Sequence, residues 1–324
     1  MFFEEERRSG ELKTFLYSFL KDLVNCDYVY LDIPGHMNVG DHLIALGAFK
    51  LLEDIPYKCI YKSTVGNFLF NRVPQGSVIL MHGGGNFGDL YPGANRYRNQ
   101  MVQSFPNNRI IFLPQTITYL DESRIKEDAQ ICSKHKDLHI CARDYKSMEI
   151  LQKYFYQNHL YLLPDTALGL YDNLPRKKIV ETNRLLIVMR KDKELDKEWI
   201  VEGADVKDWD DILDESGYNK IIFGVKCLRK IGKIFRLNLF YYLSDAFLIC
   251  VGQPFMLKVV TRYFLRYGHI YTTRLHGYIF AKLLDIPVEF QDTKYGKISA
   301  YADTWFSVNG FTHAYSYCND SYAK

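Results

Sequence analysis

Short apolar runs alternate with longer amphipathic stretches along most of the chain, and this alternation restricts the fold more than any other feature. Runs such as YVYLDI (28–33) and RIIFLP (109–114) are continuously apolar, without the polar residue at every second position that a half-exposed strand shows. Continuous apolar strands separated by helical segments are typical of a parallel sheet covered by helices on both faces. The sequence therefore predicts an α/β fold.

One polar stretch divides this pattern into two halves. Residues 171–183 (YDNLPRKKIVETN) combine proline, asparagine and charge without periodicity, which is typical of a linker. Further strands are expected beyond it, at 184–190, 220–225, 246–252, 269–274 and 287–290. The sequence therefore predicts two Rossmann-like doubly wound domains facing a central cleft, where a ligand should bind. The predicted boundaries are 1–172 for the N-terminal domain, 173–183 for the linker, 184–310 for the C-terminal domain and 311–324 for a tail.

Composition argues against several classes of protein. The 41 Lys and Arg against 38 Asp and Glu give a net charge of +3, which does not favour nucleic acid as a partner. The seven cysteines are scattered and form no Cys-x-x-Cys pair, which indicates a reduced, cytoplasmic protein without a disulfide framework or a zinc site. The acidic start MFFEEERR lacks the pattern of a secretory signal.

The most apolar stretch, residues 239–260, is interrupted by Asp245, Gly252 and Pro254. A membrane span requires about 20 predominantly apolar residues. We therefore expect a buried helix followed by a core strand in this stretch.

Ligands of parallel sheets bind beyond the carboxyl ends of the strands, so unusual residues in the loops there are candidates for a site. In PGHMNVGDH, Gly35 and Gly40 have the spacing of a phosphate-binding loop, but Asp41 and His42 stand where Lys and Ser or Thr would be needed. This argues against a nucleoside triphosphatase. Asp41 either caps the next helix or contacts a substrate.

Three further loops carry candidate residues. The glycines of GGGNFGD (83–89) either allow a ligand to approach the backbone closely or make a tight turn. Asp165 follows an apolar strand and is either a general acid or base, or a cap. Arg190 also follows a strand, and its guanidinium either binds a carboxylate or phosphate bidentately or is solvated.

The strongest signal is HIYTTRLHGYIFAKLLDIP. If the strand runs through Arg274, then Arg274 and His276 share one face while Leu275 points into the core. Gly277 would then open the helix, whose first N–H groups have no partner within the helix. An arginine, a histidine and a helix N-terminus at one spot suit a small, multiply charged anion.

Several motifs carry a resemblance to a known family. GDHLIALGAFKLLE, HGGGNFGDLY, FLPQT, ARDYKSME, PDTAL and TTRLHGYIFAKLLDIPVEFQDTK occur in the order typical of the polysaccharide pyruvyl transferases, and the resemblance spans about residues 36–295. It implies transfer of a carboxyethylidene group from phosphoenolpyruvate to a sugar, with release of phosphate and formation of a cyclic ketal. It also implies a fold similar to the two-domain GT-B glycosyltransferases, with the acceptor on the N-terminal side and phosphoenolpyruvate on the C-terminal side.

By position, the resemblance places the family's Arg-Leu-His motif on Arg274–His276, its separate donor-binding arginine on Arg190 and its acidic residue on Asp165, whereas the acceptor-facing segments match no family motif. His276 and Asp165 are expected to divide the acid and base roles, and no cofactor or metal is required. The expected donor-binding residues are Arg190, Arg274, Leu275 and Gly277. The expected acceptor or cleft residues are Gly40, Asp41, His42, Gly84, Gly85, Asn86, Asp89 and Gln115. The expected acceptor is a galactose-containing sugar, with lipid linkage as one option, in the assembly of a capsule or exopolysaccharide.

Two other patterns offer a metal site, and both have a simpler interpretation. His135 and His139 are four residues apart, but a strand is expected to begin between them, so they should not share a helix face. Asp208-Trp209-Asp210 resembles the Asp-x-Asp of metal-dependent sugar transferases, but it lies in an acidic segment expected to be a solvated helix face.

The segment 226–236 is a candidate for peripheral membrane contact. Lys226, Arg229, Lys230 and Lys233 recur at helical spacing, with apolar residues on another face. An ordinary solvated helix is the alternative.

For the whole chain, the alternatives to a pyruvyl transferase are a nucleotide-sugar glycosyltransferase of GT-B type and a non-catalytic sugar- or anion-binding protein.

Overall fold

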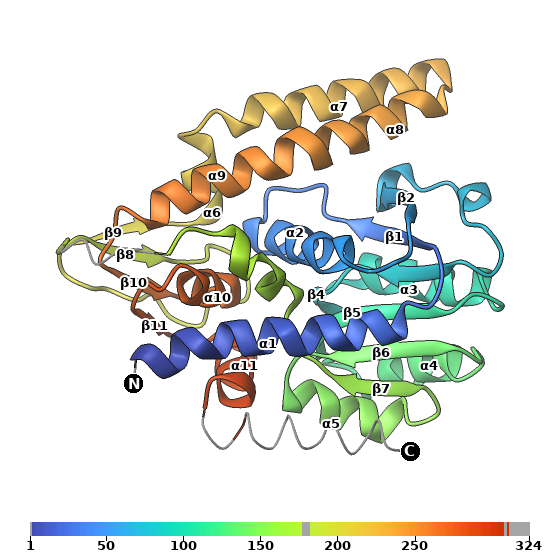
Figure 1. The fold of residues 1–324 in the computed structure, drawn as a ribbon, viewed down its shortest axis with the longest axis horizontal. Coiled ribbons are helices and arrows are strands. Elements are labelled where there is room, and N and C mark those ends of the chain that lie inside the picture. Colours follow the sequence, from blue (N-terminus) through green and yellow to red (C-terminus); the bar gives the residue numbers. More distant parts are fainter. Residues whose placement is uncertain (1, 177–181, 308–309, 311–324) are drawn as a thin grey trace.

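The computed structural model describes residues 2–176, 182–307 and 310, and it contains two parallel sheets (Figure 1). The larger sheet has the strand order β2-β1-β3-β5-β6-β7, with β4 paired to β5. Its strands are β1 (Tyr28–Ile33), β2 (Cys59–Thr64), β3 (Val78–Met81), β4 (Gly84–Gly88), β5 (Ile110–Thr118), β6 (Leu138–Ala142) and β7 (His159–Leu162). The smaller sheet has the order β11-β10-β8-β9, formed by β8 (Leu185–Val188), β9 (Ala204–Lys207), β10 (His269–Thr272) and β11 (Val288–Phe290).

Helices alternate with these strands, and every strand pairing between described residues is parallel. The α-helices are α1 (Phe2–Leu23), α2 (Val39–Glu53), α3 (Pro92–Ser104), α4 (Glu122–Cys132), α5 (Tyr145–Tyr154), α6 (Trp209–Asp214), α7 (Tyr218–Phe235), α8 (Asn238–Phe247), α9 (Gln253–Phe264), α10 (Leu275–Leu283) and α11 (Lys297–Trp305). Short helical turns lie at η1 (Val65–Asn67), η2 (Phe70–Arg72), η3 (Thr166–Asn173) and η4 (Leu248–Gly252). The predicted α/β class with parallel, Rossmann-like sheets is confirmed.

Two of the predicted strands are wrong. Residues 220–225 lie inside α7, and residues 246–252 lie in a helix that continues from α8 through η4 into α9. A continuous apolar run cannot be assigned to a strand or to a buried helix from its periodicity alone. Here α7 and α8 form a helical hairpin at the top of Figure 1.

The continuous helix Asn238–Phe264 is long and apolar enough to cross a membrane by length and composition. One of its charged residues, however, makes its contacts inside the protein. The buried carboxylate of Asp245 accepts hydrogen bonds from the backbone N–H of Thr64 (3.2 Å), the Thr64 hydroxyl (3.0 Å) and the Asn67 amide (2.6 Å). These bonds attach the hairpin to the edge of the larger sheet.

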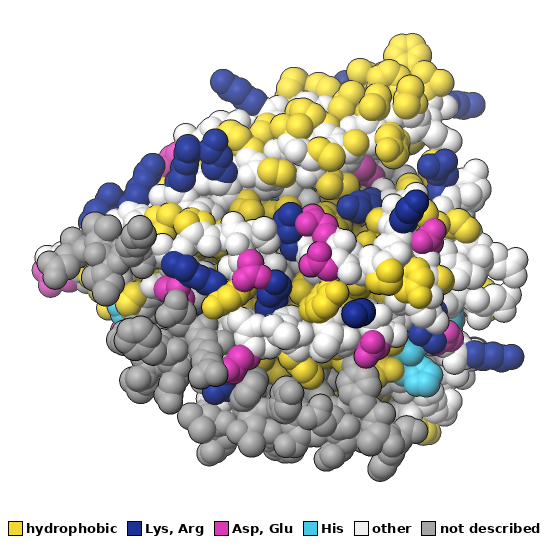
Figure 2. Space-filling model, viewed as in Figure 1, with side chains coloured by type: hydrophobic (Ala, Val, Ile, Leu, Met, Phe, Trp, Pro, Cys, Tyr) yellow, Lys and Arg dark blue, Asp and Glu magenta, His cyan; other side chains and the backbone are white. Residues whose placement is uncertain are grey.

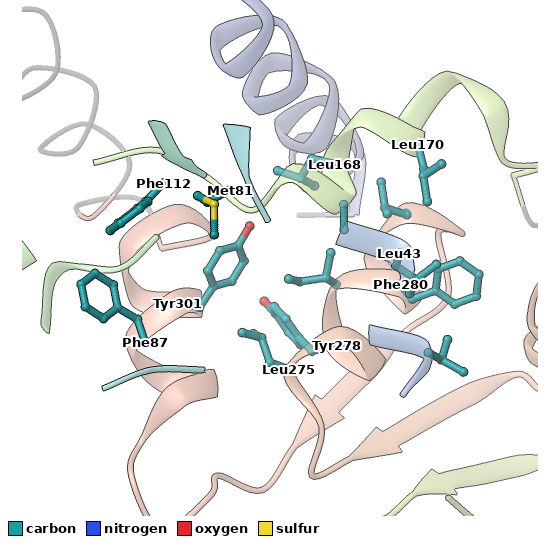
Figure 3. Packing of buried hydrophobic residues seen from close by; sticks show 14 of the residues in the cluster. Leu43, Met81, Phe87, Phe112, Leu168, Leu170, Leu275, Tyr278, Phe280 and Tyr301 are labelled. Carbon is teal, nitrogen blue, oxygen red and sulfur yellow. The ribbon is translucent and has the colours of Figure 1, made fainter. Parts of the chain in front are cut away.

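The hydrophobic core is continuous between the two sheets. Figure 3 shows Leu43 of α2, Tyr278 of α10 and Tyr301 of α11 packed in one cluster. Helix α11 packs against α5, and the indole N–H of Trp305 donates to the Arg143 carbonyl (2.8 Å). Helix α11 therefore supports the larger sheet. The domain boundaries at 172 and 310 remain a prediction. Of the predicted linker, 177–181 lie outside the described residues, as does the whole predicted tail.

Candidate active site

A cavity of 610 Å³ lies where loops of both sheets meet. Loops after the carboxyl ends of β6, β8 and β10 each contribute an arginine to it, because the carboxyl ends of parallel strands lie at one edge of a sheet. Its charged and imidazole lining groups are His36, Asp41, Arg143, Arg190, Asp192, Glu194, Arg274, His276 and Lys297. The cavity thus joins residues that are more than 200 positions apart in the sequence.

The Arg-Leu-His segment lines this cavity, but its secondary structure differs from the prediction. Strand β10 ends at Thr272, so Arg274 does not continue it, and α10 begins at Leu275, two residues before Gly277. Arg274 is the N-cap residue of α10, and Arg274, Leu275 and His276 all line the cavity. Gly277 lies outside it, where a Cβ would collide with the Thr272 side chain. Gly277 therefore allows close packing between helix and strand.

His276 forms a buried polar unit with Asp165 and Arg143. Its Nε2 lies 3.3 Å from the Asp165 carboxylate, and that carboxylate accepts a 2.7 Å hydrogen bond from Arg143. Burial alone would raise the pKa of Asp165, but His276 and Arg143 together hold it well below its usual range. Asp165 also caps η3 by accepting from the Ala167 N–H (2.9 Å).

Asp165 does not line the cavity itself. It is fully buried, it lies behind His276 rather than among the residues that line the cavity, and it remains ionised. A carboxylate in this position can orient the imidazole through the 3.3 Å contact. Of the two alternatives for Asp165, the cap is observed, and the acid or base role stays a prediction.

The two predicted donor-binding arginines are held by carboxylates. Arg274 donates to both oxygens of Asp208 (2.6 Å each), and Arg190 donates to both oxygens of Asp192 (2.7 and 2.9 Å). Asp192 also lies 3.5 Å from Arg274. Asp192 is thus a half-exposed anion between two guanidinium groups, and the cavity is lined by ion pairs rather than by unbalanced positive charge.

A second network fixes Lys297. Its ammonium donates to the buried Glu194 carboxylate (2.9 Å) and to the Gly85 carbonyl (3.3 Å). Glu194 also accepts from Arg190 (3.1 Å) and from the Tyr91 hydroxyl (2.7 Å). This carboxylate therefore connects groups from both sheets and from α11.

The expected acceptor or cleft residues divide into two groups. Asp41, Gly85 and Asn86 line the cavity, and Gly40 faces His276 from α2. Asp41 does not cap α2, because Asn38 does so by accepting from the Gly40 N–H (3.1 Å).

The remaining expected cleft residues make structural contacts outside the cavity lining. His42 bonds the His36 carbonyl and Gln253, Asp89 accepts from the Leu120 and Asp121 N–H groups, and Gln115 donates to the His82 carbonyl. Gly84 has a φ of +125° that favours glycine.

Sequence reasoning missed Arg143, Lys297 and Asp208. Arg143 follows β6 directly, so the rule that selected Asp165 and Arg190 would also have found it. Asp208 was expected on a solvated face, but it is buried and bonds Arg274, because the Asp-x-Asp segment opens α6 beside the cavity. For Lys297 the sequence offers no signal, because its placement depends on α11 packing against the larger sheet.

One group of side chains elsewhere could hold a metal ion. Ligand atoms of Asp137, His139 and His159 lie within 4.8 Å of one another, at the amino-terminal end of β6 and β7 and away from the cavity. Both ring nitrogens of His139 are already engaged, with Asp137 (2.7 Å) and Tyr161 (2.9 Å), and Arg109 pairs with Asp137. These partners argue against a metal there.

Comparison with known proteins identifies the class. The family model of the polysaccharide pyruvyl transferases matches residues 38–288, and the chain belongs to this family. It is therefore a transferase of the pyruvyl transferase class.

Individual relatives agree with this assignment. The chain is 33% identical over 282 residues to a Bacillus subtilis protein named "Putative pyruvyl transferase EpsO", covering 86% of this chain and 85% of that protein. It is 24% identical over 310 residues to "Pyruvyl transferase 1" of Schizosaccharomyces pombe, covering 85% and 68%. The crystal structure of an uncharacterized protein from Klebsiella pneumoniae has the same fold, with a TM-score of 0.59, 17% identity and coverage of 92% and 95%.

Proposed function

We propose that the protein transfers the carboxyethylidene group of phosphoenolpyruvate to two hydroxyls of a sugar in a surface-polysaccharide precursor. The observation that carries this proposal is the convergence of Arg143, Arg190, Arg274 and Lys297 around His276 in one cavity. Phosphoenolpyruvate has a carboxylate and a phosphate on a small frame, and guanidinium groups bind both kinds of anion bidentately. The first helical turn of α10 adds the positive end of a helix dipole.

The reaction requires a proton donor close to the bound donor substrate. Protonation of the methylene carbon makes C2 electrophilic, and one sugar hydroxyl then forms a C–O bond to C2. The C–O bond to phosphate breaks, a second hydroxyl adds, and the two hydroxyl protons balance the proton consumed and the proton carried by the phosphate. His276 lines the cavity and is the group assigned to proton transfer. Asp165 is a positioning residue for it.

A GT-B-like arrangement is part of this proposal. Two parallel sheets lie on either side of the cavity, with β1–β7 on the side assigned to the acceptor and β8–β11 on the side assigned to the donor. Closure of such a cleft would exclude water from the reacting groups.

Peripheral contact with a membrane is supported by the hairpin of α7 and α8. Figure 2 shows hydrophobic side chains gathered over this hairpin, among them the exposed Ile234, Phe235 and Leu239. Lys230 and Lys233 are exposed beside them and suit an anionic lipid surface. Arg229 does not belong to this surface, because its guanidinium turns inward to Asp245 (3.5 Å).

The remaining features of the proposal are a cytoplasmic enzyme, a galactose-containing acceptor that is lipid-linked or free, and no cofactor. The rival nucleotide-sugar glycosyltransferase is not favoured by the family match. Incubation with phosphoenolpyruvate and a panel of free or lipid-linked galactosides tests the proposal. We expect phosphate release that depends on both substrates, and a product heavier by one carboxyethylidene group. Turnover of a nucleoside diphosphate sugar without phosphoenolpyruvate would contradict it.

A further inference from the structure

A second, smaller cavity adjoins the candidate active site. Its volume is 300 Å³, and it shares His36, Asp41 and Asn86 with the larger cavity. Its remaining lining comes from the ends of β1, β2 and β3 and from Arg229 of α7 above them. This is again the carboxyl edge of a parallel sheet, where ligands bind. The size is at the lower end for ligand cavities, which suits one monosaccharide unit.

Asp32 occupies this cavity in a backbone conformation that needs an explanation. It lies within β1 at a φ of +65°, where the pairing register of β1 with β2 is shifted. A left-handed conformation is unusual for a residue other than glycine, and such strain is concentrated at functional sites. Here the irregularity directs a carboxylate into a cavity at the end of the strand.

Three buried polar atoms of the residues that line the cavity lack a hydrogen-bond partner among the described residues. They are Oδ2 of Asp32, which lies 3.7 Å from Arg98, Nε2 of His82 and Nε of Arg229. The other ring nitrogen of His82 lies 2.9 Å from the Tyr30 hydroxyl. Buried polar groups are nearly always hydrogen-bonded, so three such atoms around one cavity indicate a polar ligand.

The protonation states suit the recognition of hydroxyl groups. Burial raises the pKa of Asp32 to about 6, although Arg98 opposes the shift, so the group is mostly an acceptor carboxylate at neutral pH. Burial lowers the pKa of His82 to about 3, so its imidazole is neutral. Arg229 also lines the cavity, but its guanidinium lies 3.5 Å from the Asp245 carboxylate, which offsets its charge. The carboxylate of Asp32, the neutral imidazole of His82 and the nearby Asn86 amide suit uncharged hydroxyls.

We propose that this smaller cavity binds the acceptor sugar, with Asp32 and His82 as its hydroxyl-binding residues. The inference rests on the proposed function, because it assigns the two cavities to the two substrates of that reaction. The shared residues His36, Asp41 and Asn86 mark the junction at which a sugar hydroxyl would meet C2 of phosphoenolpyruvate.

The test compares Asp32→Asn and His82→Gln with the wild-type chain and with Asp303→Asn, which makes the same charge change at an exposed position of α11. We expect the KM for the sugar to rise about tenfold to a hundredfold in both cavity variants, since each loses a buried hydrogen bond, one of them to a charged group. The KM for phosphoenolpyruvate should stay within about twofold of wild type. An unchanged sugar KM in folded variants, or an equal rise in both KM values, would overturn the proposal.

A binding measurement separates this inference from the reaction. Saturation-transfer NMR with a panel of methyl hexosides should show binding to the wild-type chain that is lost in Asp32→Asn and His82→Gln but kept in Asp303→Asn. If this holds while no pyruvyl group is transferred, the cavity is a sugar site and the proposed reaction is wrong. No binding to the wild-type chain, or undiminished binding to both cavity variants, would overturn the assignment. His82→Gln decides the question if Asp32→Asn does not fold.

Discussion

A Cβ atom placed on Gly40 would lie 2.5 Å from Nδ1 of His276, so α2 and α10 approach each other at the imidazole itself. Glycine is therefore required on α2 for His276 to keep its orientation toward Asp165. We predict that Gly40→Ala lowers kcat by about a hundredfold, because displacing a reacting group by about an ångström has that effect. Steady-state phosphate release measures the loss.

Gly224→Ala is the matched control, because it makes the same substitution within a helix, α7, where a Cβ would meet only the Phe247 side chain, at 3.2 Å. That variant should retain wild-type activity, and both variants should keep the circular-dichroism spectrum of the wild-type chain. Full activity in a folded Gly40→Ala protein would show that the position of His276 does not matter.

Asp192 competes with any anion that binds Arg190 and Arg274, since it contacts both. Replacing it by asparagine removes one negative charge beside the two guanidinium groups. We predict that Asp192→Asn binds inorganic phosphate and phosphoenolpyruvate about three- to tenfold more tightly, a gain in binding free energy of about 1 kcal/mol. Isothermal titration calorimetry measures it. Asp196→Asn on the same segment should bind like wild type. Weaker binding to Asp192→Asn would mean that this carboxylate helps to build the anion site.

The contact between His276 and Asp165 predicts strongly non-additive mutations. If Asp165 acts only through His276, then His276→Gln and the double variant His276→Gln/Asp165→Asn should have the same residual kcat. Asp165→Asn alone should reduce kcat by about tenfold to a thousandfold. A double variant whose loss is the product of the two single losses would assign an independent role to Asp165.

The buried imidazole of His42 should make the free energy of unfolding fall at mildly acidic pH. Burial lowers its pKa to about 4 from an ordinary 6.5, so the unfolded state binds more protons between these values. Stability should therefore decrease as pH falls through this window, by about 2 kcal/mol between pH 7 and pH 5 for this group. Urea unfolding of the wild-type chain and of His42→Gln measures it. The variant should be less stable at pH 7 but lose about 2 kcal/mol less on acidification. Equal pH slopes would contradict the assignment.

The exposed surface of the hairpin predicts binding to anionic vesicles. Changing Lys230 and Lys233 to glutamate should abolish co-sedimentation with vesicles that contain phosphatidylglycerol, because juxtamembrane cations contribute about 1 kcal/mol each. The same change at Lys134 and Lys136, two exposed lysines that precede β6, is the control. Retention of vesicle binding in the hairpin variant, or its loss in the control, would assign the contact to another surface.

Local sequence patterns predicted the parallel sheets and the segments of the site that directly follow strands. Arg190 and the Arg274–His276 segment could be predicted in this way, because the carboxyl ends of the strands determine which loops meet. The prediction of strands at 220–225 and 246–252 was wrong, because these apolar runs belong to helices. Helix and strand cannot be distinguished there from hydrophobicity alone.

Contacts between distant segments account for the other differences. Lys297 reaches the cavity because α11 packs on α5, and Asp208 is buried because Arg274 neutralises it. His42 and Gln115 lie in family-like motifs, yet both side chains make hydrogen bonds inside the protein, His42 with Gln253 and Gln115 with the His82 carbonyl. Such partners depend on the tertiary structure, so the sequence alone could not show them.

A crystal structure of the complex with phosphoenolpyruvate tests the central claim most directly. The account predicts that the carboxylate and phosphate contact Arg190 and Arg274, that the carboxylate of Asp192 has moved away, and that the methylene carbon faces His276. Phosphoenolpyruvate bound outside the 610 Å³ cavity, or bound within it with its methylene carbon directed away from the imidazole, would contradict the account.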